Sequence, residues 1–243
     1  MRFHILVCTF LVHTSHIRLS NWIVYILQDF LIICNQSVRL LISLLLLIIT
    51  NHNFDTNIPL FALSFDDGFL DCYDSIYSEL KMRDIEACFF INSTLHSYDN
   101  KSKADVIKNI DHKNKTFMSW EMIDEISSGG QLIGSHGCNH LRLADQDWVQ
   151  FLADVLSNEE IIFKNIGKKV DYFAWPYGRN IDVTENQVNY LRSRYKCVFS
   201  GDSFRSYFSY SGKVINRRHV EPYWPSSHIK YSVSHEKKIF NSN

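Results

Sequence analysis

The sequence predicts an α/β protein built as a parallel (β/α) barrel, and three observations predict it. Short apolar runs alternate with helical patterns along the chain, which is typical of parallel βα units. About seven or eight such units fit into 243 residues, and this favours a closed barrel over an open sheet. Polar motifs follow several predicted strands, at the ends where such barrels place their chemistry.

The predicted strands are short apolar runs bounded by polar or turn residues. In chain order they are Phe30–Cys34, Leu60–Phe65, Glu86–Asn92, Gln131–Ser135, Asp171–Trp175, Lys196–Ser200 and Lys213–Val220. The predicted helices are Ser37–Thr50, Leu70–Met82, Ser119–Ser128, Asp147–Asn165 and Thr184–Arg194. Ser119 fits a helix start with an acidic residue in the first turn, and Gly129 and Gly130 end that helix.

Two apolar runs near the N-terminus bear on location. The run Val38–Thr50 has 13 residues, whereas crossing a bilayer takes about 20. We therefore predict a buried helix there, and membrane association is the disfavoured alternative. The run Ile5–Val12 resembles the core of a signal peptide, but no small-residue cleavage site follows it. We predict no signal peptide and leave a cytoplasmic or cell-envelope location open.

The chain divides into three segments by composition. Residues 1–58 are an apolar N-terminal segment, which we expect to supply the first βα unit or units of the same domain. Residues 59–225 form the expected main domain, which contains the polar motifs described below, and residues 226–243 form a polar C-terminal tail. The oligomeric state is not predicted.

Composition narrows the classes of partner. Lys plus Arg total 25 and Asp plus Glu total 26, so the net charge is -1. This charge balance predicts no basic surface for binding nucleic acid or anionic lipid. The six cysteines contain no C-x-x-C pair, which favours buried free thiols over a disulfide framework. Aromatic residues make up 14% of the chain, which suits a sugar-binding cleft as well as an ordinary core.

Two adjacent carboxylates, Asp66 and Asp67, come directly after the predicted strand Leu60–Phe65 and before Gly68. A glycine at a strand end lets the backbone turn, so that both side chains can reach one pocket. Two carboxylates packed together repel each other unless a cation separates their roles. The pattern indicates either a metal ligand with a free base beside it or a plain turn before a helix.

His136 and His140 follow the predicted strand Gln131–Ser135 with a spacing of four, which places both rings on one side of a helical turn. A catalytic zinc site needs three protein ligands and one open position. Gly137 follows the first histidine, so the H-E-x-x-H pattern of metalloproteases is absent. Combined with the aspartates at an earlier strand end, the histidine pair predicts a divalent-metal site.

A third motif, Trp175-Pro176-Tyr177, ends the predicted strand Asp171–Trp175. Its turn could aim a backbone N–H at a developing oxyanion. Its rings could wall a sugar-sized cleft, so we take all three residues as candidate substrate-binding residues. The alternative is a strand exit with two core aromatics.

The three motifs together resemble the polysaccharide deacetylase family, of the carbohydrate esterase family four type. The family's T-F-D-D-G is similar to Ser64–Gly68, its H-[ST]-x-x-H to His136–His140, and its R-x-P-Y to Ala174–Tyr177 in the second half. Order and spacing agree, and the resemblance covers roughly residues 60–225. It implies a distorted parallel (β/α) barrel of about seven strands, rather than the eight of a regular barrel.

This resemblance also implies an activity and a cofactor. Asp67, His136 and His140 would hold a divalent metal, most often zinc, and Asp66 would be the general base. The metal would activate a water and polarise the amide carbonyl that the water attacks. The expected reaction removes N-acetyl groups from an amino-sugar polysaccharide or glycoconjugate, so the expected partner is a carbohydrate.

Two further roles are carried over. The backbone N–H of Tyr177 would stabilise the oxyanion, and His219 is the candidate proton donor to the leaving amine. The late family motif is not reproduced clearly around His219, so a structural role is the alternative there.

The chain departs from the family pattern at two motif positions. Ala174 stands where the family has an arginine that orients the base, and Arg217, Arg218 or Arg179 are candidate substitutes. Gly137 replaces a serine or threonine, which removes a hydroxyl beside the first histidine. These departures leave a catalytically impaired, carbohydrate-binding relative as the alternative function.

Overall fold

The computed structural model describes residues 5–10, 60–97, 116–201 and 206–220, with short pieces at 224–225, 227–228, 231 and 238–240. The predicted strand Phe30–Cys34 and helix Ser37–Thr50 lie outside these residues. Within the described parts of the chain, no helix combines the length and apolar character needed to cross a membrane.

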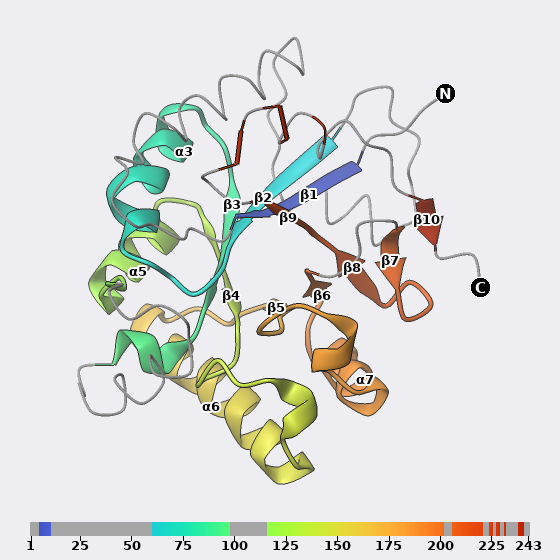
Figure 1. The fold of residues 1–243 in the computed structure, drawn as a ribbon. Coiled ribbons are helices and arrows are strands. Elements are labelled where there is room, and N and C mark those ends of the chain that lie inside the picture. Colours follow the sequence, from blue (N-terminus) through green and yellow to red (C-terminus); the bar gives the residue numbers. More distant parts are fainter. Residues whose placement is uncertain are drawn as a thin grey trace.

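The described strands join into one sheet in the order β10-β7-β8-β6-β5-β4-β3-β2-β1-β9 (Figure 1). Their bounds are β1 Ile5–Phe10, β2 Leu60–Phe65, β3 Ala87–Ile91, β4 Leu132–Ser135, β5 Tyr172–Ala174, β6 Cys197–Ser200, β7 Ser206–Ser209, β8 Val214–Asn216, β9 Arg218–Val220 and β10 Lys238–Phe240. The principal helical elements are a π-helical segment at Cys72–Tyr77 that continues into α3 Ser78–Met82, then α5 Trp120–Ser128, α6 Trp148–Ile166 and α7 Glu185–Arg194.

The sheet curls and closes on itself through residues 214–220, which pair with β6 on one side and with β1 on the other. β8 pairs with β6, whereas β9, which begins one residue after Arg217, pairs with β1 on the other side. The stretch 214–220 therefore closes a ring with β1 to β6, and every pairing in that ring is parallel. The predicted distorted parallel barrel of about seven strands is confirmed.

Most elements fall within one or two residues of their predicted bounds, and helix caps explain why. Ser119 accepts the Met122 N–H at the start of α5. Asp147 at α6 and Thr184 at α7 each form a capping box with a glutamine three residues later. Side chains that satisfy the first N–H groups fix where these helices begin.

Four strand features differ from the prediction. One is β10, which was not predicted and pairs with β7 from within the segment expected to be a polar C-terminal tail. The predicted single strand Lys213–Val220 is divided at Arg217 into β8 and β9. β7, Ser206–Ser209, was not predicted and runs antiparallel to β8. β1 was also missed, and its whole length pairs in register with β2.

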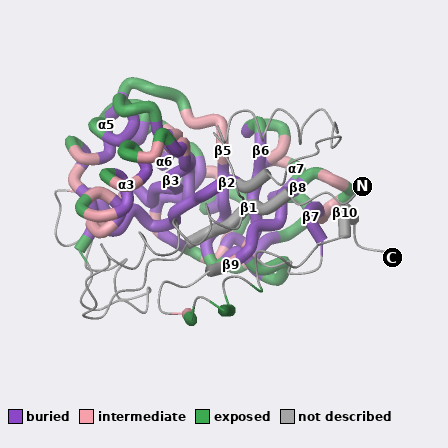
Figure 2. Tube along the Cα trace, turned by 90° about the horizontal axis from the view of Figure 1, so that it is seen from above, coloured by how far each residue is buried: buried purple, intermediate pink, exposed green. Residues whose placement is uncertain are grey.

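The core consists of two clusters of buried hydrophobic side chains. One packs β2, β3 and β4 against α3, α5 and the C-terminal half of α6. The other packs β5 and β6 against α7 and the N-terminal half of α6. The central strands β3 to β6 are buried except at Leu132 and Tyr172, which are partly exposed, whereas the helices expose one side (Figure 2). The cysteines whose side chains the structure describes are free and buried, as predicted: Cys72, Cys88, Cys138 and Cys197.

Candidate metal centre

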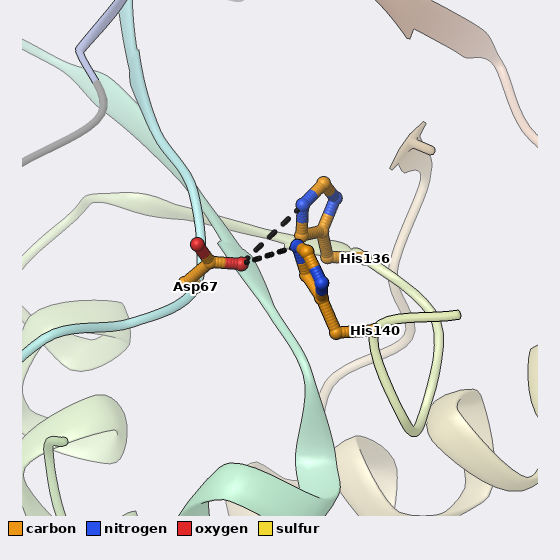
Figure 3. A group of neighbouring side chains, drawn as sticks. All are labelled: Asp67, His136 and His140. Carbon is orange, nitrogen blue, oxygen red and sulfur yellow. Dashed lines mark ion pairs between the residues drawn. The ribbon is translucent and has the colours of Figure 1, made fainter. Parts of the chain in front are cut away.

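The carboxyl ends of β2 and β4 bring an aspartate and two histidines together. Asp67 follows β2, and His136 and His140 follow β4 (Figure 3). The Nε2 atoms of His136 and His140 lie 3.5 and 3.3 Å from Oδ1 of Asp67. One potential ligand atom from each residue lies within 4.8 Å of the others, and all three residues are buried. The structure thus places the three predicted metal ligands around one point.

The backbone at this centre is unusual. Asp67, His140 and Tyr177 have φ angles of 69°, 51° and 64°, in the left-handed region that side chains other than glycine seldom adopt. Such conformations cost free energy and persist only where the surroundings impose them. All three residues belong to the predicted site, which indicates that the fold holds their side chains in particular directions.

Both histidines are kept in the neutral form that binds metals. Burial lowers the pKa of His140 to about 4. Burial also lowers the pKa of His136 below its ordinary value, against the opposing charges of Asp66 and Asp67. The Nδ1–H of His136 donates to the Ala174 carbonyl oxygen at 2.7 Å, which leaves its Nε2 lone pair facing Asp67.

The donor set fits a divalent metal ion. Two neutral imidazole nitrogens and one carboxylate oxygen converge, which is a ligand set that zinc accepts. With three protein ligands, a fourth position stays open for water or substrate, as in catalytic sites. Within the described residues, this is the group of histidine, cysteine and acidic side chains close enough to hold an ion.

Asp66, the neighbouring carboxylate, faces a different partner. Arg217 donates to it through Nη1 to Oδ1 at 2.7 Å and through Nη2 to Oδ2 at 2.8 Å. Burial raises the pKa of Asp66, but the Arg217 charge and hydrogen bond and the two histidines outweigh it, so the pKa falls below its ordinary value. Asp66 therefore stays ionised beside the metal ligands without belonging to their group.

Among the three arginines considered as substitutes for the one missing at Ala174, Arg217 is the arginine that pairs with Asp66. Besides Asp66, it donates to the Ser64 hydroxyl at 3.1 Å and to the Ser200 carbonyl at 3.1 Å, and its side chain is only 1% exposed. Arg179, another predicted substitute, instead pairs with Asp182 at 2.9 Å. The arginine that pairs with Asp66 thus comes from the break between β8 and β9.

The third motif contributes differently from the prediction. Trp175 is completely buried, and its Nε1–H donates to the Arg179 carbonyl at 3.1 Å. Pro176 is buried as well. The prediction that these two side chains line a sugar cleft is wrong, because both pack in the protein interior; the strand exit with a core aromatic describes Trp175.

Tyr177 remains a candidate for substrate contact. Its side chain is 48% exposed, and its ring packs edge-on against His140 with centroids 4.9 Å apart. The Arg142 guanidinium also lies over this ring, 5.8 Å from its centroid. Tyr177 and Arg142 also line an open cavity of about 850 Å³ with Asp145, Gln146 and Gln150 among its other walls.

His219, the predicted proton donor, lies on β9 two residues beyond Arg217. It is partly buried, and its ring packs edge-on against Trp224 with centroids 5.9 Å apart. Its place near the Asp66 partner is compatible with the predicted role, which stays a prediction.

Sequence reasoning missed the polar residues that hold the backbone of His136–His140, which we call the ligand loop. Asn92 donates to the carbonyls of His136 and Gly137, at 2.5 and 3.1 Å. Asp154 accepts N–H groups from the same loop, and both side chains are buried. The signal available was an Asp and an Asn, Asp154 and Asn158, one turn apart on the otherwise apolar face of a long predicted helix.

Comparison with known proteins gives one family match. Residues 54–195 match the model of a family described as polysaccharide deacetylase. A peptidoglycan-N-acetylglucosamine deacetylase of Bacillus cereus is 26% identical over 130 residues, which is 53% of this chain and 39% of that protein. The chain thus spans well under half the length of this curated relative.

Two solved structures share the fold over nearly the whole chain. A deacetylase of Streptococcus pyogenes, PplD in complex with acetate, matches with a TM-score of 0.69 at 14% identity, covering 96% of this chain and 99% of that one. IcaB from Ammonifex degensii also has a TM-score of 0.69, at 18% identity, covering 96% of this chain and 98% of that one. At such identities the likeness establishes the architecture.

Proposed function

The chain belongs to the polysaccharide deacetylase family, and from this premise we propose that it is a metal-dependent hydrolase of N-acetylated amino sugars. The observation that carries the proposal is that two adjacent carboxylates have different partners. Asp67 meets the two histidines, whereas Asp66 pairs with Arg217 and stays ionised. A metal ligand set with a separate buried base suits metal-assisted hydrolysis of an amide.

The proposed reaction converts an N-acetyl amide and water into acetate and a free amine. A divalent metal, which we propose is zinc, would be held by Asp67, His136 and His140 and would supply Lewis acidity and a lowered pKa for water. Asp66 accepts the proton of the attacking water, because its carboxylate is ionised and fixed by Arg217.

Two groups complete the proposed mechanism. The backbone N–H of Tyr177 donates to the developing oxyanion, since its turn follows β5 directly beside His140. His219 gives a proton to the leaving nitrogen, so that the amine departs neutral. The half-exposed ring of Tyr177 and the cavity beside it offer a surface for the sugar.

The proposed substrate class is an amino-sugar polysaccharide or glycoconjugate. The Bacillus cereus relative is named for N-acetylglucosamine in peptidoglycan, and the solved PplD structure contains acetate, the expected product. The alternative, an impaired carbohydrate-binding relative, was motivated by the alanine at position 174. Arg217 weakens that alternative, because it supplies a cation to the base from another strand.

Replacement of Asp66 by Asn tests the proposal. Asp66→Asn keeps the shape of the side chain but removes the base, so acetate release from an N-acetylglucosamine oligomer should fall by about 10²–10⁴-fold. Zinc affinity should stay within a few-fold of the original value, because Asp66 is outside the ligand group. Asp67→Asn is the matched control, in which metal affinity and activity should fall together.

Either of two results contradicts the proposal. One is a metal-loaded protein that releases no acetate from any N-acetylated amino sugar, and the other is an Asp66→Asn variant with unchanged acetate release.

A further inference from the structure

The loop between the two candidate histidine ligands is held from one side by a single buried carboxylate. Asp154, on α6 and 5% exposed, accepts the Cys138 N–H at Oδ2 (3.0 Å) and the Asn139 N–H at Oδ1 (3.1 Å). The Asn139 side chain adds a third bond to Oδ1 at 3.0 Å. Hydrogen bonds to an ionised acceptor are stronger than neutral ones, and a low-dielectric interior strengthens them further.

Gly137 leaves the space that this carboxylate occupies. Its φ angle is +74°, and a Cβ atom added there would lie 2.6 Å from Oδ2 of Asp154. A side chain at position 137 and the carboxylate at position 154 are therefore mutually exclusive without a shift. Asp154 takes the place beside the first histidine that a residue with a side chain would fill.

The opposite side of the loop and the helix itself are also fixed. Asn92, at the end of β3, holds the carbonyls of His136 and Gly137. One turn beyond Asp154 on α6, the buried Asn158 donates to the Ile91 carbonyl and to the Ser135 hydroxyl, at 2.9 and 2.8 Å. The helix that carries Asp154 is thus tied to the ends of β3 and β4.

This support matters most for His140. His136 is oriented by its own bond from Nδ1 to the Ala174 carbonyl. Nδ1 of His140, in contrast, has no hydrogen bond to another described residue, although it is buried. The direction of the His140 ring is therefore set by its backbone, which is left-handed with φ of 51°, and by packing against Tyr177. The backbone just before it is the part that Asp154 holds.

We propose that Asp154 is a positioning residue for the metal centre, which fixes the Gly137–Asn139 backbone so that His140 meets the ion together with His136 and Asp67. This inference rests on the proposed metal-dependent function. Partners that orient metal ligands without touching the metal commonly change affinity by 10- to 100-fold when they are replaced.

Zinc affinity of the Asp154→Asn variant tests the proposal. Asn is close in shape but has one acceptor oxygen, so its NH₂ group would face one of the two loop N–H groups. Competition with a chromophoric chelator should show zinc binding weakened by about 10- to 100-fold. Circular dichroism and thermal unfolding of the metal-free variant would report whether it is folded under the same conditions.

Ile162→Ala is the matched structural control. Ile162 is fully buried on α6, eight positions beyond Asp154, and belongs to the core cluster away from the ligand loop. Its truncation should lower the unfolding temperature, because it leaves a cavity, but zinc affinity of the folded protein should stay within about two-fold. A general loss of stability would move both variants alike, whereas a positioning role weakens zinc binding only in the Asp154 variant.

A double-mutant cycle tests the proposed pairing with Gly137. Gly137→Ala should weaken zinc binding in the original protein, because the new methyl group meets the carboxylate. In an Asp154→Ala background the same change should cost less, since the obstructing oxygen is gone. If Asp154→Asn does not fold, Asn139→Ala keeps both backbone bonds to Asp154 and removes the side-chain bond, together with the bond that Asn139 Oδ1 accepts from the Thr94 hydroxyl. This variant should still weaken zinc binding several-fold.

The outcomes separate the two proposals. If the original protein binds zinc and the folded variants at positions 154 and 139 bind it equally well, the positioning role is wrong and the proposed function stands. If the original protein binds no divalent metal, the proposed function fails and the positioning role fails with it.

Discussion

Asp66 is buried against Arg217, and this pair should determine how activity depends on pH. Above an ordinary pKa of about 3.9 the unfolded carboxyl is ionised, and the lowered folded pKa keeps Asp66 ionised further into acid. In Arg217→Gln the burial remains while the opposing cation is lost, so the pKa of Asp66 rises. The acid limb of kcat/KM should therefore move to higher pH.

The pH profile of acetate release, measured side by side for the variant and the original protein, checks this. Arg217→Lys is the control, because it keeps the charge and loses the two-pronged geometry. Its acid limb should stay close to that of the original protein even if its rate is lower. If the acid limb of the Arg217→Gln profile lies at the same pH as that of the original protein, Arg217 does not govern the ionisation of Asp66.

At the residue scale, the sequence identified the residues that meet at the candidate metal centre but not the polar residues that hold them. Asp66, Asp67, His136 and His140 could be found because their types and spacing stand within one motif each. Arg217 was one of three arginines that could not be ranked, since its pairing with Asp66 depends on where the closure of the barrel through β9 and β1 places the residue between β8 and β9. Trp175 was misassigned because a strand-end aromatic has the same pattern whether it faces a cleft or the core.

Helix α6 is the element that links the fold to the ligand loop, and its start is fixed by a capping box. Asp147 Oδ1 accepts the Gln150 N–H at 2.9 Å, and Gln150 Oε1 accepts the Asp147 N–H at 3.2 Å. Asp147→Ala should lower the free energy of unfolding by about 1 kcal/mol. Denaturant unfolding measures this, with Asp145→Ala as the exposed control expected to stay within about 0.5 kcal/mol.

Equal destabilisation by both substitutions would mean that the cap contributes nothing beyond an exposed carboxylate. Zinc affinity should be unchanged in both variants, because Asp147 lies at the first turn and Asp154 two turns further along the helix.

At the element scale, long periodic segments were predictable and short or closing ones were not. α5, α6 and α7 carry both an apolar face and caps, so their starts were predicted to within one residue. β7 has the sequence Ser-Tyr-Phe-Ser, which is too short to distinguish from a loop. β8 and β9 are continuous in sequence, and only the pairing with β6 on one side and β1 on the other divides them.

At the scale of the whole molecule, the barrel explains why distant motifs meet. Parallel strands present their carboxyl ends at one rim, so β2, β4 and β5 deliver the three motifs to the same place. Closure through the stretch 214–220 then adds Arg217 to that rim. The sequence predicted that the motifs meet at one rim, because each motif follows a predicted strand. The closure could not be predicted, because it depends on pairings between residues about 210 positions apart, such as Cys8 with Arg218.

The fold should not depend on the metal, and the metal should still stabilise it. The two core clusters hold the sheet and helices together and include none of the three candidate ligands, as in catalytic rather than structural metal sites. At free zinc about 100 times Kd, binding to the folded state alone adds about 2.7 kcal/mol. For a chain of this size, each kcal/mol raises the unfolding temperature by about 2–4 °C, so we expect an increase of about 5–10 °C.

Thermal unfolding with a chelator and with zinc measures this shift, and far-ultraviolet circular dichroism at 25 °C checks the metal-free fold. The metal-free spectrum should match that of the zinc-loaded protein, since the ligands are presented by strands and turns that pack without it. His140→Ala is the control that should lose most of the shift, because it removes one of three ligands. A protein that unfolds on chelation at 25 °C would instead mean that the ion belongs to the core, as in structural zinc sites.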